Sequence, residues 1–124
     1  MNKLTNEESK VIEQGGTELP FTSPLLDEKR NGTYNCKKCD QPLFESDAKF
    51  DSGSGWPSFD KAIKGSVKLK DDFSLFSHRI EVLCSNCDGH LGHRFPDGPR
   101  ETTGIRNCIN GVCLAFEEKI NGNN

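Results

Sequence analysis

The chain begins with a short stretch of helical pattern. Thr5, with Glu8 three residues later, has the spacing of a capping box, which satisfies two backbone N–H groups at a helix start. Apolar residues at 11–12 supply a small buried face, and a glycine pair at 15–16 ends the run. We therefore predict a short N-terminal helix near residues 5–14.

Downstream of this helix the pattern changes to the two-residue period of β-strands, with turn residues between short apolar runs. The alternation is clear over residues 78–84, where Ile80 and Val82 share one face. Further strands are predicted at 33–36, 66–70, 104–108 and 112–118. The pattern therefore predicts a mainly β core over about residues 33–118, followed by a frayed tail at 119–124.

The composition indicates a single small domain with a limited aliphatic core. Only 32% of the 124 residues are hydrophobic and the mean hydropathy is −0.69. Eight Phe, one Trp and one Tyr nevertheless supply enough aromatic area for a folded core, which argues against disorder. Six cysteines raise the question of whether metal binding or thiol chemistry supplements that core.

Charge and the lack of export signals exclude several functional classes. Sixteen basic and 19 acidic residues give a formal net charge of −3, whereas nucleic-acid-binding domains are normally basic. The polar start MNKLTNEESK resembles no signal peptide, and the chain has neither a membrane-spanning apolar run nor a lipidation motif. We therefore expect a monomer in the reducing cytoplasm, where cysteines favour metal binding or chemistry, with no nucleic-acid or membrane partner.

Two C-x-x-C pairs predict a metal site. Cys36 pairs with Cys39 and Cys84 with Cys87, and the pairs are separated by 44 residues (40–83). Two residues between thiolates let a tight turn present both sulfurs to one cation, and four thiolates complete a tetrahedral structural zinc site. A redox C-x-x-C or four buried cysteines are the alternatives, and the second pair disfavours the redox one. We therefore expect one structural Zn2+ per chain.

Two cysteines and a histidine pair remain outside this set. His90 and His93 alone lack the third ligand of a catalytic zinc site, so proton transfer, orientation and ordinary turn hydrogen bonds are all open for them. Cys108 with one of these histidines and Asn110 could imitate a papain-like acyl-transfer site. A zinc-ribbon-like binding module without catalysis, which would need a partner surface, is a further alternative.

Five ordered motifs cover nearly the whole chain. They are GTELPFT at 16–22, YNCKKCDQPLF at 34–44, KFDSGSGWPSF at 49–59, RIEVLCSNCDGHLGHRFPDGP at 79–99 and TGIRNCING at 103–111. Together they closely resemble the type B methionine sulfoxide reductases, which repair proteins by reducing the R epimer of methionine sulfoxide. The resemblance implies a β fold of two antiparallel sheets, a structural zinc on the four cysteines and a nucleophilic cysteine in the last motif.

The resemblance assigns the nucleophile to Cys108. Its thiolate would attack the sulfoxide sulfur, leaving methionine and a sulfenic acid on the cysteine. Arg106, two positions away on the same strand face, is expected to lower the pKa of this thiol. His90 and His93 resemble the pair of donors that protonates the departing oxygen, and Asn110 is expected to help hold the attack geometry.

The resemblance also implies a substrate pocket. Trp56 corresponds to an aromatic wall against the substrate's S-methyl group, where sulfur–aromatic contact is favourable. Phe95 could line the same pocket, and Asp97 could orient one of the histidines. The alternatives are core packing for the two aromatic residues and an exposed turn for Asp97.

Two positions depart from the family pattern. Many members carry a recycling cysteine where this chain has Ser54, and a tyrosine where it has Asn107. Serine cannot form the disulfide that discharges a sulfenic acid, so we expect thioredoxin, glutaredoxin or glutathione to reduce Cys108 directly. Asn107 could alter substrate packing without removing the nucleophile.

Cys113 is the alternative resolving thiol. If residues 108–113 form one strand, they span roughly 16 Å, beyond the ~7 Å Cα limit of a disulfide. If Asn110 and Gly111 form a type I′ hairpin turn, Cys108 and Cys113 face one another within reach. The resemblance favours a run without the hairpin, in which Cys113 is a small packed residue.

Overall fold

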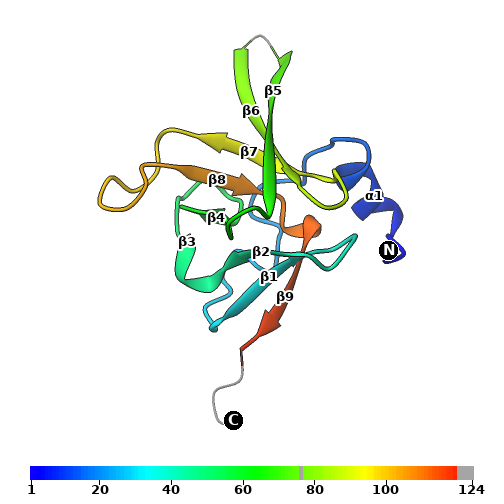
Figure 1. Ribbon diagram of the computed structural model, residues 1–124, viewed down its shortest axis with the longest axis horizontal. Coiled ribbons are helices and arrows are strands. Elements are labelled where there is room, and N and C mark those ends of the chain that lie inside the picture. The colour runs from blue at the N-terminus through cyan, green and yellow to red at the C-terminus, as the bar shows by residue number, and fades with distance from the viewer. Residues whose placement is uncertain (76, 120–124) are drawn as a thin grey trace.

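The computed structural model describes residues 1–75 and 77–119. Within these ranges the chain forms one short α-helix and nine β-strands, arranged as two antiparallel sheets (Figure 1). This confirms the mainly β fold predicted from the sequence. The predicted tail at 119–124 lies outside the described residues, except for Lys119. No helix in the described part of the chain is long and apolar enough to cross a membrane.

The smaller sheet has the strand order β2-β1-β9. Its strands are β1 (Gly32–Cys36), β2 (Pro42–Glu45) and β9 (Leu114–Glu118), and the central β1 pairs antiparallel with both neighbours. Alternate residues of β1 are buried, Tyr34 and Cys36 among them. Because β1 ends at Cys36, the first C-x-x-C pair lies in the turn that leads into β2.

The larger sheet has six strands in the order β3-β4-β8-β7-β6-β5. Their bounds are β3 Lys49–Phe50, β4 Ser58–Phe59, β5 Val67–Leu75, β6 Ser77–Cys84, β7 His90–Phe95 and β8 Arg106–Ile109. The hairpin of β5 and β6 extends away from the body of the molecule (Figure 1). At the centre, β8 lies between β4 and β7, so β4, which is distant in sequence, comes to lie beside β8.

The core between the two sheets is aromatic, as the composition predicts. Phe44 of β2 stacks on Phe59 of β4 with ring centroids 4.4 Å apart. Tyr34 of β1 meets Phe59 edge-on at 5.0 Å and Phe116 of β9 at 4.9 Å. These contacts join residues of both sheets, and aromatic pairs of this kind stabilise a core beyond their buried area.

The single helix described, α1 (Asn6–Ile12), begins with the predicted capping box. The Thr5 hydroxyl accepts a hydrogen bond from the Glu8 backbone N–H at 3.2 Å, and the Glu8 carboxylate accepts one from the Thr5 N–H at 2.9 Å. The buried end of α1 packs near β7 and a 3-10 helix at Gly111–Cys113. That 3-10 helix replaces the start of the strand predicted at 112–118, so β9 begins only at Leu114.

Candidate active site and metal centre

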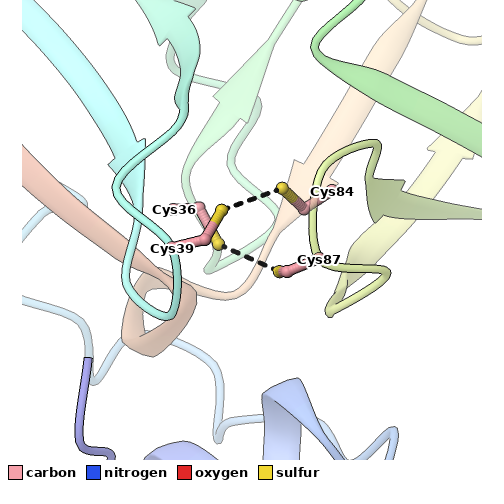
Figure 2. Close-up of side chains that lie close together, drawn as sticks. All are labelled: Cys36, Cys39, Cys84 and Cys87. Carbon is pink, nitrogen blue, oxygen red and sulfur yellow. Dashed lines mark hydrogen bonds between the residues drawn. The ribbon is translucent and has the colours of Figure 1, made fainter. Parts of the chain in front are cut away.

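The four cysteines of the C-x-x-C pairs come together from two turns (Figure 2). Cys36 and Cys39 lie in the turn between β1 and β2, and Cys84 and Cys87 in the turn between β6 and β7. Each turn closes with the N–H of the following Asp donating to the carbonyl of the first Cys, at 2.8 and 2.9 Å. The two turns therefore present their sulfurs in the same way, as the spacing predicts.

The sulfur geometry fits a tetrahedral metal ion. All four sulfurs lie within 4.8 Å of one another. The Sγ atoms of Cys36 and Cys87 are 3.7 Å apart, and those of Cys39 and Cys84 are 3.5 Å apart. Thiolates at about 2.3 Å from a tetrahedral zinc are separated by roughly 3.8 Å, so the set can hold a metal ion. Because the turns belong to different sheets, such an ion would join the two sheets.

A pocket of about 240 Å³ lies at the centre of the larger sheet. Cys108 on β8 has Ser58 of β4 and His93 of β7 as its direct cross-strand partners. The pocket lining includes six residues selected by the family resemblance, namely Trp56, His93, Phe95, Arg106, Cys108 and Asn110. A side chain at Gly92, between the histidines, would collide with the Cys108 backbone, which explains the glycine there.

Burial controls the acidity of the Cys108 thiol. Burial raises its pKa above the ordinary 9.0, and this effect outweighs the opposing Arg106 charge and Ser54 side chain. The expected lowering of this pKa is therefore wrong as a net effect, although Arg106 acts in the expected direction. Asp97 weakens that action, because its own charge raises the pKa of Cys108.

Arg106 is held in place at the pocket wall by two contacts. Its Nε donates to a carboxylate oxygen of Asp97 at 2.9 Å, and its guanidinium lies 4.4 Å from the centroid of the Phe95 ring. Asp97 thus orients the arginine and not a histidine, which corrects the role expected for it. The arginine in turn covers Phe95 at the wall of the pocket.

Asp72 of β5 orients His93. Its carboxylate lies 2.7 Å from Nε2 of His93, and hydrogen bonds from Ser74 and His93 lower the pKa of Asp72. An ionised carboxylate only accepts hydrogen bonds, so Nε2 of His93 carries the proton and Nδ1 remains a proton acceptor. Burial lowers the pKa of His93, which favours this neutral ring. Arg79 also donates to Asp72, at 3.3 Å.

His90 is oriented separately and is buried. Its Nδ1 lies 2.7 Å from a carboxylate oxygen of Glu81, and its ring meets that of His93 edge-on with centroids 5.5 Å apart. Nε2 of His90 is buried without a hydrogen-bond partner among residues 1–75 and 77–119. Of the two histidines, His93 is the one that lines the pocket.

Glu18 connects the tryptophan of the pocket to the end of β8. Its backbone carbonyl accepts a hydrogen bond from Nε1 of Trp56 at 2.9 Å, and its N–H donates to Oδ1 of Asn110 at 3.0 Å. Its carboxylate accepts hydrogen bonds from the backbone N–H groups of Gly111 and Val112. Burial raises the pKa of Glu18, in opposition to these hydrogen bonds. Asn110 also donates to the Leu91 carbonyl at 3.0 Å, which fixes its side chain.

The two positions that depart from the family pattern lie in different surroundings. Ser54 lines the pocket with Cys108, and its hydroxyl is 2.8 Å from that of Ser52. Asn107 is buried away from the pocket, where it donates to the Phe59 carbonyl at 3.1 Å and accepts from Arg94 at 2.7 Å. Asn107 therefore links strands β4, β8 and β7 and does not contact the pocket directly.

Cys113 is buried in the 3-10 helix, where its thiol donates to the His90 carbonyl at 3.3 Å. The strands that flank this helix, β8 and β9, belong to different sheets. The hairpin that would place Cys108 and Cys113 opposite one another is therefore not formed. Burial also raises the pKa of Cys113 well above its usual range, which disfavours a thiolate there.

The SelR domain, which defines the methionine-R-sulfoxide reductases, matches residues 4–118. The chain belongs to this family. The reductase is accordingly an oxidoreductase that acts on methionine-R-sulfoxide in oxidised proteins. Its fold is also similar to the crystal structure of a Mis18 "Yippee-like" domain, with a TM-score of 0.58 and 18% identity over 73% of this chain and 99% of that one. At this identity the likeness concerns the fold alone.

Several residues of the reductase site escaped the sequence reasoning. Asp72 on β5 reaches His93 across strand β6, and Arg79 bonds to the same carboxylate. Residue spacing along the chain does not predict such a contact. Glu81 on β6 likewise bonds to His90 on the neighbouring strand β7. Glu18 and Thr17 lie within the first family motif, but their contacts with Trp56 and the pocket depend on how the segment folds.

Proposed function

We propose that this chain reduces methionine-R-sulfoxide residues through a sulfenic acid on Cys108. The observation that carries the proposal is the position of Cys108 as the cross-strand partner of His93 in one pocket. Asp72 holds His93 as the tautomer with an unprotonated Nδ1, which is the form required to accept a thiol proton. This arrangement supplies a base for a thiol whose pKa is raised by burial.

The reaction transfers oxygen from one sulfur to another. The Cys108 thiol gives its proton to Nδ1 of His93, and the thiolate attacks the sulfoxide sulfur. The proton passes from His93 to the sulfoxide oxygen. As the sulfur–oxygen bond of the substrate breaks, the hydroxyl group bonds to the Cys108 sulfur to give S–OH, the transient sulfur–sulfur bond breaks, and its electron pair returns to the substrate sulfur as methionine. The substrate sulfur is reduced by two electrons and the cysteine sulfur is oxidised by two, so atoms and charge balance.

The pocket walls bind and orient the substrate. Trp56 offers an aromatic surface for the S-methyl group, because sulfur and methyl groups pack well against aromatic rings. Its ring is fixed by the hydrogen bond to Glu18. Phe95 and Arg106 form another part of the lining, and Asn110 fixes the end of β8 beside the nucleophile. His90 supports His93 by ring contact.

Recycling is proposed to use an external thiol. Ser54 stands in the pocket where a cysteine would discharge the sulfenic acid, and serine cannot form the disulfide. Cys113 is the alternative resolving thiol, but its burial and its hydrogen bond to His90 disfavour that role. Thioredoxin, glutaredoxin or glutathione in the cytoplasm would then attack the Cys108 sulfur directly. A monomer suffices, since one chain supplies every residue named.

The metal centre is proposed to hold one structural Zn2+. Cys36, Cys39, Cys84 and Cys87 supply the four thiolates, and a zinc ion bound by four thiolates has no open position for substrate. Gln41 supports the centre by donating to the Ser66 carbonyl at 2.8 Å and contacting Sγ of Cys84 at 3.6 Å. The ion would stabilise the junction of the two sheets.

Turnover of a methionine-R-sulfoxide derivative with dithiothreitol tests the proposed reaction. We expect activity that requires reductant and is lost in Cys108→Ser but retained in Cys113→Ser. An acyl-transfer enzyme built on the same cysteine would need no reductant, and a binding module would show no turnover. A stable Cys108–Cys113 disulfide in most molecules after treatment with substrate alone would refute recycling by an external thiol.

A further inference from the structure

An exposed apolar pair borders the catalytic pocket. In the described part of the chain, Leu19 and Phe21 expose 73% and 69% of their surfaces. The segment that carries them forms one edge of the pocket: Thr17 lines it, and the Glu18 carbonyl binds the Trp56 indole. The Phe21 ring lies over Gly55, between the pocket residues Ser54 and Trp56, since a Cβ at Gly55 would come within 3.0 Å of it. Leu19 lines a neighbouring hollow that shares Thr17 with the pocket.

The backbone holds this pair in place at a conformational cost. Phe21 has φ of 62°, a left-handed conformation that a bulky residue rarely adopts. Its N–H donates to the Gly55 carbonyl at 2.7 Å, and the Thr22 hydroxyl donates to the Leu19 carbonyl at 2.6 Å. Strain of this kind persists where surrounding structure enforces it, and it clusters at functional sites. The surrounding hydrogen bonds therefore hold Phe21 in its exposed position.

The size of the pocket determines which part of a substrate lies outside it. Its volume of about 240 Å³ is below the roughly 300–1,000 Å³ of ordinary small-molecule sites, so it accommodates about one side chain. When a methionine sulfoxide side chain enters, its backbone and neighbouring residues must pass over the rim. Adjacent residues of an extended chain lie about 3.3 Å apart, so the next few reach the edge formed by the 17–21 segment.

We propose that Leu19 and Phe21 form a docking ledge for apolar residues flanking methionine sulfoxide in a locally unfolded substrate protein. The proposal rests on the function proposed above. Methionine is mostly buried in folded proteins, among other apolar residues. When its surroundings unfold, those residues become exposed and can cover the ledge, which removes apolar surface from water on both partners. A folded substrate would keep the same residues buried.

The test compares three substrates that carry the same methionine-R-sulfoxide group. They are the blocked single amino acid, a peptide with leucine and valine flanks, and a peptide with glycine and serine flanks. For the wild type we expect kcat/KM to be about tenfold higher with the apolar peptide than with the polar one, from the apolar area buried. This comparison needs no variant and so does not depend on folding of an altered chain.

Two variants test whether Leu19 and Phe21 cause the preference for the apolar peptide. Leu19→Ser and Phe21→Asn remove the apolar groups, and asparagine tolerates the backbone conformation of Phe21. We expect each to remove most of the preference for the apolar peptide and to leave turnover of the blocked amino acid unchanged. Phe73→Ser is the matched control, since Phe73 is 72% exposed on β5 and does not border the pocket. It should leave all three substrates unaffected.

Three outcomes would refute the proposed docking role of Leu19 and Phe21. One is equal turnover of the two peptides by the wild type. Another is an equal loss with all three substrates in the variants, which would mean that the segment shapes the pocket itself. The third is a loss seen with thioredoxin but not with dithiothreitol, which would assign the ledge to the reductant. Failure of the proposed reaction is distinct, because the wild type would then not turn over even the blocked amino acid.

Discussion

The Asp72 carboxylate on β5 lies 2.7 Å from Nε2 of His93 on β7, although strand β6 runs between the two strands. The contact crosses the face of the larger sheet and reaches the residue opposite Cys108, the proposed nucleophile. It makes the orientation of His93, the proposed base, dependent on a hairpin that otherwise extends away from the molecule (Figure 1).

Asp72→Asn should therefore impair catalysis more than binding. An amide can donate as well as accept, so it no longer fixes the tautomer of His93. We expect kcat to fall by about 10- to 100-fold, with little change in KM. Steady-state kinetics with the blocked amino acid would measure this. Asp71→Asn is the control, because Asp71 contacts only the exposed His78 by side chain in the described structure. A rise in KM at unchanged kcat would contradict the role.

The reactivity of Cys108 should depend on pH as that of a partly buried thiol does. Its raised pKa means that the thiolate fraction is small near neutral pH and grows as the pH rises through the raised value. We expect the rate of alkylation by iodoacetamide to keep increasing above the ordinary thiol pKa of 9.0. Mass spectrometry can assign the modified cysteine. A plateau at a pH below that ordinary value would contradict the dominance of burial.

Arg106→Gln tests whether the arginine charge lowers the pKa of Cys108, in the same titration. Removing the guanidinium removes a charge that lowers the pKa of Cys108, so the alkylation midpoint should move to still higher pH. Arg100→Gln, at an exposed position in the 99–103 turn, should leave the midpoint unchanged. An unaltered midpoint in Arg106→Gln would show that pairing with Asp97 already cancels the charge.

Ser54→Cys should create a resolving thiol in the pocket. Ser54 and Cys108 line the same small pocket, so a cysteine at 54 is placed to attack a sulfenic acid on Cys108. We expect an intramolecular disulfide after one turnover without reductant, detected by peptide mapping. Ser52→Cys is the control, because Ser52 bonds to Ser54 but is not among the lining residues described. Absence of the disulfide in Ser54→Cys would contradict the geometry.

The sequence predicted those features that depend on spacing along the chain. The capping box at Thr5, the alternation in β6 and the two C-x-x-C turns are local patterns, and each has the expected form in the structure. Strands such as β4 contain only two residues, which is too short a segment to show the alternation of apolar and polar residues that predicts a strand. β7 contains two histidines and a glycine, which interrupt its apolar alternation.

Interactions between segments distant in sequence were not predictable in the same way. The pairing of Asp97 with Arg106 follows from β7 lying beside β8, and it removed Asp97 from the role expected for it. Burial of Cys108 is likewise a property of the packed sheet, and it reverses the direction of the pKa expected from Arg106 alone. Glu18 acquires its contacts only when the 17–21 segment folds over Trp56.

Glu18→Ala should loosen Trp56. The carboxylate anchors the 17–21 segment to Gly111 and Val112, and the same residue holds the indole by its carbonyl. Trp56 is the single tryptophan of the chain, so its fluorescence reports this site alone. We expect red-shifted emission, easier quenching by acrylamide and a KM that rises more than kcat falls. Glu101→Ala, in an exposed turn, is the control. Unchanged emission with a changed kcat would refute the positioning role.

Loss of the metal should separate the two sheets. The turn of Cys36 and Cys39 belongs to the smaller sheet and that of Cys84 and Cys87 to the larger one, and the aromatic core between them is small. Structural zinc contributes on the order of 10 kcal/mol to the folding of small domains, so its removal should be strongly destabilising. We expect one zinc per chain by atomic emission, and a large fall in Tm on chelation or in Cys39→Ser.

Cys113→Ser is the matched control for this experiment, because Cys113 is a cysteine outside the four-sulfur set. It should keep full zinc content and lose only the modest stability expected when a buried thiol becomes a hydroxyl. Turnover gives a second readout. The turn with Cys84 connects β6 to β7, and β7 also carries His93 of the pocket. Chelation should therefore abolish turnover at the temperature where the sheets separate. Retained Tm and turnover after complete removal of zinc would refute a structural metal.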